Sequence, residues 1–395
     1  MTESLDIHIS DSTAALVASK VQAIERLLDL ARQGSLGYLD DRLYLRIQFD
    51  NDSVVWRSQI LAAKLEMVTG SDQIWRKFVK GTLIITRRFY WETEAMQALE
   101  VSSYSTAATT GYATIYNGSD GGVPNDFSVA AAQVTGSLPA PAKIYIKNIS
   151  GASRAFGTAY IGNYVFNDPT NIVPYYKAAT ASFSNTTPGP TTTETGIYQW
   201  AIGSALVNDF AGQFGRFVVV WSDRPAIATL IRAAIQVTAT ATFDLALGEQ
   251  MLDVPNDFVQ DLGALPIPPG GYIAGMGADM SFALKALPAA GVEDTLGVTM
   301  LHIFPSGIGR FRVVKGISNF SMGSNEEVID DGPNNVTYSL SGAAASPLFR
   351  PLYSPIYLWP GRLNTMRLII SGGTTFEDNY AWGIKMEFRP RRLSF

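Results

Sequence analysis

Only one stretch of this chain carries the periodicity of a helix, and this restricts the fold more than any other feature. Between Ser10 and Ser35, apolar residues recur at alternating spacings of four and three positions, which places them in one stripe along a helix. The stripe consists of Val17, Val21, Ile24, Leu28 and Ala31. We expect this helix to cover one face of a sheet; docking onto a neighbouring subunit is the alternative.

Both ends of this helix have the residues that such ends require. The candidate N-caps are Ser10, Asp11 and Ser12, whose side-chain oxygens can accept from the first free N–H groups. Gly34 is the candidate C-terminal stop. The sequence therefore predicts a single helix close to the start of the chain.

From residue 41 the period changes to two. In "RLYLRIQF" the residues Leu43, Leu45, Ile47 and Phe49 alternate with polar neighbours, as in a half-buried strand. Further strands are expected in "VVWRSQI" (54–60), in "AKLEMV" (63–68) and within 75–92. Residues 1–98 are thus predicted to form a helix plus an antiparallel sheet.

After residue 100, short apolar runs alternate with clusters of Gly, Pro and Asn. Strands are expected at 142–149, 215–222 and 230–247, and in the final hundred residues within "LGVTMLHIFP", "GRFRVVKGI", "NTMRLIIS" and "AWGIKMEFRP". Many short strands at close spacing are typical of β-sandwiches and jelly rolls. The fold class is therefore mainly β, with two tandem β-sandwich or jelly-roll domains after the helix-plus-sheet domain.

A repeated phrase suggests where those domains divide. "VPNDF" occurs at 123–127 and again at 254–258, and each copy is followed by a similar second phrase, "GSLPAP" at 136–141 and "GALPIP" at 263–268. Asp126 and Asp257 have no catalytic partner motif, so the phrase reads as turn material. We expect it to mark the entry to each sandwich, which predicts domains at 1–98, 99–250 and 251–395.

The composition narrows the function. Charged residues make up only 16% of the chain, against about 25% in ordinary soluble domains, which favours surface buried against partner chains. The net charge of −5 argues against nucleic-acid binding. No apolar run is long enough for a membrane span, and the acidic start "MTESLDIHISD" is unlike a secretion signal. With no cysteine, disulfides and thiolate metal sites are excluded.

Few residues suit catalysis. The two histidines, His8 and His302, are far apart and lack a supporting motif, and neither a GxSxG, a HExxH nor a phosphate-binding loop occurs. The paired carboxylates are expected in solvated turns rather than across a cleft; they are Glu293–Asp294, Glu326–Glu327 and Asp330–Asp331. The segment Asn325–Asn335 is a weak Ca²⁺ candidate without fixed ligand spacing. We predict no catalytic residue, no cofactor and no metal, and hence no enzyme.

Aromatic residues leave a second binding hypothesis open. A stacking platform for sugar rings would draw on Trp200, Trp221, Trp359 and Trp382, although Trp221 and Trp382 lie in strand patterns and are expected in the core. The glycosylation sequons are attributed to the richness in Asn, Ser and Thr; they lie at Asn117, Asn148, Asn185, Asn319 and Asn335.

Two segments give the chain a family resemblance. "ITRRFYWE" (Ile85–Glu92) followed by "GSLPAPAKIYIKN" (Gly136–Asn148) resembles structural proteins of bacteriophage and prophage tails, and the plan resembles the distal tail protein family. The closing run "IYLWPGRLNTMRLIISG…KMEFRPRRLSF" fits the last strands of the galectin-like or carbohydrate-binding-module-like sandwiches in that family. The simplest members have one such sandwich, whereas two are expected here.

The resemblance implies a mechanical function. The N-terminal domain would close a homo-oligomeric ring at the tail tip or baseplate, joining tail tube to hub, in a virion assembled in the host cytoplasm. The sandwiches would brace the ring or touch host glycans, and the basic terminus with Arg389, Arg391 and Arg392 would pair with acidic neighbours or stay solvated. The alternatives are another virion component (tail tube, capsid decoration or fibre base) and a carbohydrate-binding receptor adhesin.

Overall fold

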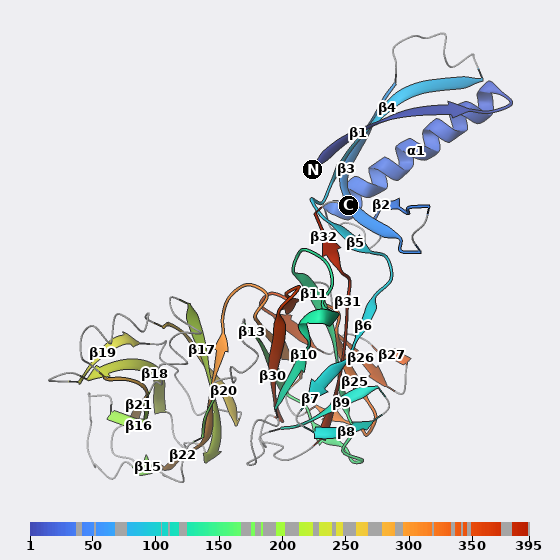
Figure 1. Cartoon of the computed structure of the whole chain (residues 1–395). Helices are drawn as coiled ribbons and strands as arrows, with labels where there is room; N and C mark the ends of the chain where they lie inside the picture. Colours follow the sequence, from blue (N-terminus) through green and yellow to red (C-terminus); the bar gives the residue numbers. More distant parts are fainter. Residues whose placement is uncertain are drawn as a thin grey trace. The chain divides into compact units, whose positions relative to one another are not determined.

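The structure is a computed structural model of the whole chain (Figure 1). It describes all residues except 37–41, 51–52, 68–76, 104, 110, 118–124, 167–174, 178–182, 185–194, 202–212, 224–228, 239–241, 248–257, 268–278, 289–294, 318–319, 333–335, 341–342, 346–348, 373–380 and 394–395. The predicted fold class is confirmed: within the described residues, one α-helix accompanies antiparallel sheets. The chain forms two compact units, unit 1 (1–97, 135–138 and 389–395) and unit 2 (98–134 and 139–388).

Unit 1 is an antiparallel sheet with one helix. Its strands are β1 (Thr2–Ser10), β2 (Tyr44–Ile47), β3 (Trp56–Met67), β4 (Phe78–Arg87), β5 (Trp91–Thr93) and β32 (Arg391–Arg392), in the order β1-β4-β3-β5-β32 with β2 also on β3. The two strands expected at 54–60 and 63–68 are one continuous strand, β3. No turn separates them; instead the register with β4 shifts between Ile60 and Ala62, so the strand continues through an irregularity.

The helix α1 (Ala14–Ser35) lies along one face of this sheet (Figure 1). Its predicted apolar stripe is the face that it buries: Val17 and Ala31 are each 1% exposed, and Val17 packs with Ile9 and Val79 from the sheet. The N-cap is Thr13, not one of the three residues before it, since its Oγ1 accepts from the N–H of Leu16 at 3.3 Å. The helix ends one residue after Gly34, with Leu36 as C-cap.

Unit 2 contains two pairs of sheets. The first pair shares a core that includes Phe127, Ile144, Phe156, Leu368 and Trp382. One of its sheets has the order β28-β23-β13-β30-β10-β7, built from Arg350–Leu352, Phe311–Lys315, Thr158–Phe166, Leu363–Ser371, Asp126–Val129 and Val101–Ser103. The other has the order β27-β26-β25-β11-β31-β9-β8, built from Ala343–Ala345, Val336–Leu340, Glu327–Asp330, Ala140–Asn148, Ala381–Phe388, Tyr112–Tyr116 and Ser105–Thr109.

Short elements complete this first pair. β29 (Tyr357–Leu358) pairs with β11, and β6 (Gln97–Leu99) pairs with β31. β12 (Arg154–Ala155) pairs with β24 (Ser321–Met322), and a 3₁₀ turn spans Ala131–Gln133.

The second pair of sheets is built from the middle of the chain. One sheet has the order β14-β22-β17-β20, from Tyr175–Lys177, Thr295–Pro305, Phe214–Asp223 and Val259–Pro266, with β15 (Phe183–Ser184) also on β22. The other has the order β16-β21-β18-β19, from Thr195–Ala201, Asp279–Pro288, Thr229–Thr238 and Thr242–Leu247. Their shared core includes Phe217, Trp221, Phe282 and Phe304.

The strand pairing does not follow the expected boundary at 250/251. β10 pairs with β30, so residues near 127 and 366 share one sheet, while strands from 175 to 305 pair among themselves. The second pair of sheets is therefore nested within the sequence of the first. Local periodicity identifies strands but carries no information on which distant strand each will meet.

The second phrase of the repeat occupies two different positions. In the first copy, Pro139 lies just before β11, and Ala140 and Pro141 open that strand. In the second copy, Leu265 and Pro266 are the last residues of β20, so the expectation of a strand entry is wrong there. Asn256 and Asp257 lie outside the described residues.

Candidate functional site

The described carboxylates considered for catalysis have structural partners, and Asp330 is buried in β25 rather than solvated in a turn. Asp330 is 1% exposed and forms a bidentate ion pair with Arg312, at 2.8 Å from Nε and 2.6 Å from Nη2. Glu327 accepts from the hydroxyl of Tyr112, and Glu326 accepts from the N–H of Gly323. Asp331 lies 3.7 Å from Nζ of Lys143, so each described carboxylate of these pairs has a structural partner. Glu293 and Asp294 lie outside the described residues.

The Ca²⁺ candidate loop and the sequons have structural roles where they are described. Within the described residues, no group of three or more His, Asp or Glu side chains is placed to hold a metal. Asn117 and Asn148 are both fully buried, and the Nδ2 of Asn117 donates to the carbonyl oxygen of Ile370 at 2.7 Å. Buried amides of this kind fix strand ends and are closed to glycosylation. Asn185, Asn319 and Asn335 lie outside the described residues.

The two histidines occupy opposite environments. His8 is exposed on β1 and meets the ring of Phe78 edge-on, with centroids 5.4 Å apart. His302 is 2% exposed on β22, with its Nδ1 3.2 Å from Nη1 of Arg367. Because a guanidinium can only donate, that nitrogen of His302 accepts and the ring is neutral. Burial, together with the charge of Arg367, lowers the pKa of His302 well below its usual value.

Arg367 and Asp126 form a second buried ion pair in unit 2. Arg367 is 1% exposed and donates from Nε and Nη2 to the two carboxylate oxygens of Asp126, at 2.7 and 2.8 Å. Burial raises the pKa of Asp126, while the guanidinium acts in the opposite direction. Since arginine keeps its charge, the carboxylate beside it is the compensating anion. Asp126, in the first copy of the repeated phrase, therefore has a structural role. Its partner Arg367 lies 241 positions away in the sequence, where no local pattern could indicate the pairing.

The tryptophans considered for a sugar platform are buried or half-buried where they are described. Trp221 and Trp382, expected in the core, are 1% and 0% exposed. Trp359 is half-buried, and the guanidinium of Arg310 lies 5.6 Å from its ring centroid. The side chain of Trp200 lies outside the described residues.

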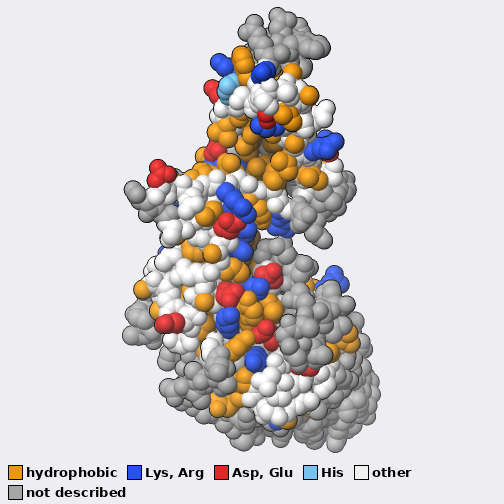
Figure 2. All heavy atoms as spheres, turned by 90° about the vertical axis from the view of Figure 1, so that its right-hand side faces the viewer, with side chains coloured by type: hydrophobic (Ala, Val, Ile, Leu, Met, Phe, Trp, Pro, Cys, Tyr) orange, Lys and Arg blue, Asp and Glu red, His pale blue; other side chains and the backbone are white. Residues whose placement is uncertain are grey.

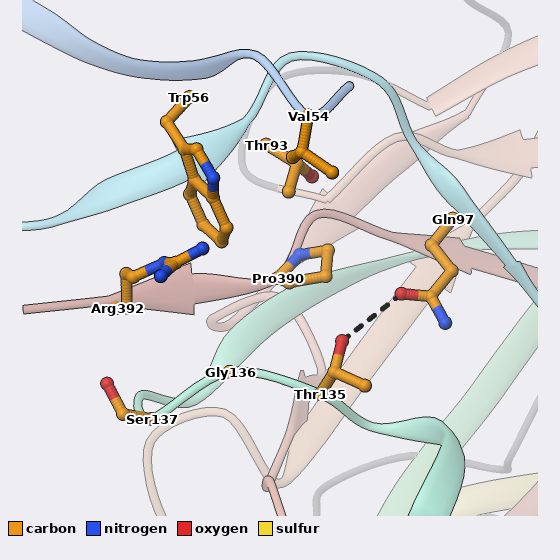
Figure 3. Close-up of a pocket in the computed structure, with 9 residues that line it drawn as sticks. All are labelled: Val54, Trp56, Thr93, Gln97, Thr135, Gly136, Ser137, Pro390 and Arg392. Atoms are coloured by element: carbon orange, nitrogen blue, oxygen red, sulfur yellow. Dashed lines mark hydrogen bonds between the residues drawn. The ribbon is translucent and has the colours of Figure 1, made fainter. Parts of the chain in front are cut away.

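Unit 1 contains a pocket of about 560 Å³, which Figure 3 shows in close-up. The guanidinium of Arg392 stacks on Trp56 at 3.5 Å from the ring centroid, and on the other side the hydroxyl of Thr135 donates to Oε1 of Gln97 at 3.2 Å. The remaining lining residues are Val54, Thr93, Gly136, Ser137 and Pro390. This lining contains neither a carboxylate nor an imidazole, so it offers no general base.

The pocket forms because three distant segments meet in unit 1. The N–H of Ser137 donates to the carbonyl oxygen of Arg391 at 2.8 Å, and Gly136, at φ +107, packs so closely that a Cβ would lie 2.5 Å from the same oxygen. Arg391 also pairs with Glu92 at 3.2 Å. The expectation that the basic terminus meets acidic neighbours is therefore confirmed for Arg391.

Unit 1 also exposes apolar side chains on the outside of α1. Leu16, Leu27 and Leu30 are 48%, 46% and 46% exposed. Their spacings of eleven and three place them on one side of the helix, apart from the stripe that packs on the sheet. Figure 2 shows hydrophobic side chains gathered on the part of the visible surface that belongs to unit 1. The spacing of these three leucines can be read from the sequence, but the more regular apolar stripe that packs on the sheet dominates the helical pattern.

The sheet of unit 1 has two edges without a described neighbour. β1 ends the strand order, and no described strand pairs with its outer side. β2 pairs only with Trp56–Gln59 of β3, while β4 takes the opposite side, so Leu61–Met67 also lack a described partner on the β2 side. Unpaired strand edges are sites where further strands add.

Comparisons with known proteins give little beyond this geometry. No family model matches the sequence, and no curated protein is similar to it. The structure of the infectious bursal disease virus Gx strain is 10% identical, with 75% of this chain and 82% of that chain covered and a TM-score of 0.19. The T=1 particles derived from infectious bursal virus are also 10% identical, with 75% and 78% covered and a TM-score of 0.20. Likenesses this weak carry no argument about fold or function. No described helix is long and apolar enough to cross a membrane.

Proposed function

We propose that this protein is a non-enzymatic structural component of a virion that works as a homo-oligomer. The observation that carries the proposal is the surface of unit 1, which combines the exposed leucines of α1 with a nine-residue strand at an open sheet edge. Monomeric proteins usually protect such edges and keep large apolar side chains apart. Burying both against further copies removes the aggregation hazard and also accounts for the low share of charged residues.

A closed ring fits this surface better than an open chain of subunits. Head-to-tail contacts form an open chain with an unpaired edge at each end, unless the rotation from one subunit to the next returns to the first subunit. A closed ring has no unpaired edge. Following the family resemblance, the proposed position of such a ring is a phage tail tip, between tail tube and hub, with assembly in the host cytoplasm. The buried side chains of Asp126, Asp330 and His302 support a structural role, since they form ion pairs and hydrogen bonds within the fold.

The mass of the purified full-length chain tests the proposal. Sedimentation velocity and native mass spectrometry are expected to give a discrete multiple of the 42.8 kDa protomer, and negative-stain images are expected to show rings. A stable monomer at concentrations up to about 100 µM, far above the Kd of an ordinary specific interface, would refute it. A monomer that binds glycans and loses binding after Trp359→Ala would support the adhesin alternative instead.

A further inference from the structure

The two open edges of unit 1 are oriented so that one copy can extend the sheet of the next. β1 and β3 both run antiparallel to β4, so β1 and β3 are parallel to each other. Copies related by rotation about an axis along the sheet would therefore present β1 of one copy to β3 of its neighbour as a parallel pair. This inference rests on the proposed function, because it names the contact by which copies assemble.

On both edge strands, apolar side chains face α1 and charged side chains lie on the opposite face of the sheet. On β1, Ile7 and Ile9 pack toward α1, and Asp6 and His8 lie on the outer face. On β3, Ala63 and Met67 pack toward α1. The alternating residues Lys64 and Glu66 form an ion pair with each other on its outer face, where their side chains are 63% and 53% exposed and remain open to a neighbouring strand. A neighbouring strand can therefore join without placing polar residues on the apolar face.

We propose that Leu61–Met67 of one copy pair in parallel with Glu3–Ile9 of the next, residue for residue. In this register Lys64 lies beside Asp6, and Glu66 lies beside His8. On the helix side, Ala63, Leu65 and Met67 then lie beside Leu5, Ile7 and Ile9. Leu5, 40% exposed and paired with Leu83 of its own chain, gains further apolar neighbours on its open side.

Neighbouring registers are less favourable. Only shifts by two residues preserve the faces. A shift in one direction places Glu66 beside Asp6, which opposes two carboxylates. A shift in the other direction places Lys64 beside His8 and leaves Asp6 without a cation. Charge therefore selects one register among those that hydrophobicity allows.

The register also introduces a stagger. Within one copy, Leu5 and Leu65 both pair with Leu83 and so lie in line across the sheet. Between copies, Leu5 lies beside Ala63 instead, two residues along the strand. A constant stagger of this kind tilts the strands relative to the axis, as a closed barrel requires. The contact therefore generates a ring rather than a flat, growing sheet.

Engineered cysteines give the sharpest test, because the chain has no cysteine of its own. In the proposed register Ser4 of one copy lies beside Ala62 of the next, on the outer face. Within one copy β4 separates β1 from β3, so these positions are about 10 Å apart, too far for a disulfide. The double variant Ser4→Cys/Ala62→Cys is expected to form a ladder of covalent oligomers on mild oxidation. Absence of the ladder in a protein that still oligomerises would overturn the proposal.

The single variants exclude a two-fold arrangement. Ser4→Cys alone, or Ala62→Cys alone, is expected to stay monomeric on a denaturing, non-reducing gel. Covalent dimers from either single variant, as abundant as those from the double variant, would mean that like edges meet and would overturn the head-to-tail contact.

A charge exchange tests the register without cross-linking. Asp6→Lys and Lys64→Asp are each expected to weaken assembly by about tenfold, because one attractive contact becomes repulsive. The double exchange is expected to restore affinity to within about threefold. Arg350→Glu, an exposed reversal in unit 2, is the matched control and should leave assembly unchanged. Circular dichroism confirms that each variant is folded.

The outcomes separate the two proposals. If the wild-type chain forms rings that are insensitive to both exchanges, this contact is wrong and the proposed function stands. If the wild-type chain is monomeric, both fail. Single exchanges that weaken assembly without rescue by the double exchange would also overturn the proposed register.

Discussion

Replacing Asp126 with asparagine is expected to destabilise unit 2 by about 3–5 kcal/mol. Arg367 is 1% exposed and bonds to both carboxylate oxygens, at 2.7 and 2.8 Å. The asparagine leaves this guanidinium buried without a compensating charge, and breaking one side of a buried pair costs about this much. His302 cannot replace the carboxylate, because it offers Arg367 only a neutral ring nitrogen.

Urea unfolding measures this loss through the fluorescence of Trp221 and Trp382, both buried in unit 2. Asp29→Asn breaks an exposed pair on α1 and serves as the control, with an expected cost below about 0.5 kcal/mol. Asp126→Leu/Arg367→Met removes both charges and is expected to recover most of the loss. A cost below about 1 kcal/mol for Asp126→Asn would show that water reaches the guanidinium and would refute the reasoning.

Three further predictions concern single positions. Burial lowers the pKa of His302, so below about pH 6.5 the unfolded state binds a proton that the folded state does not. Stability should therefore fall as pH decreases from 7 to 5, and His302→Gln should flatten this slope in urea titrations. Gly136→Ala places a Cβ 2.5 Å from a backbone oxygen at φ +107 and should lower the melting temperature of unit 1. Gly361→Ala, at φ +68 with open space around it, should cost less; equal losses would show that the clash is relieved. Leu27→Lys should leave the unfolding free energy within about 0.5 kcal/mol but weaken assembly, whereas Leu28→Lys should cost more than about 2 kcal/mol; a reversed order would contradict the assigned helix faces.

Local patterns predicted unit 1 well. The helix from Ala14 to Ser35 buries the stripe that its spacing indicates, and the alternation around Leu43 and Leu45 corresponds to β2. Both signals depend only on residues a few positions apart. The N-cap was misplaced because Asp11, Ser12 and Thr13 all have suitable oxygens, and the backbone path alone selects Thr13.

Long-range pairing could not be predicted in this way. Asp126 meets Arg367, and Asp330 meets Arg312, because sheets bring these residues together after the strands have chosen partners. The repeated "VPNDF" suggested a boundary that the strand pairing does not follow. The pocket around Trp56 could not be predicted from local patterns either, because its lining residues come from three segments that are far apart in the sequence.

The closing strand of unit 1 has a consequence for synthesis in the cell. β32 pairs with β5, and its carbonyl at residue 391 receives the N–H groups of Ser137 and Leu138. During synthesis, β1 and α1 therefore leave the ribosome long before β32, the strand that completes the sheet of unit 1, has been made. A chain that stops before residue 391 exposes the open edge of β1 while the sheet of unit 1 still lacks β32. Because β32 is made only after the strands of unit 2, a chain that stops within unit 2 cannot complete the sheet of unit 1.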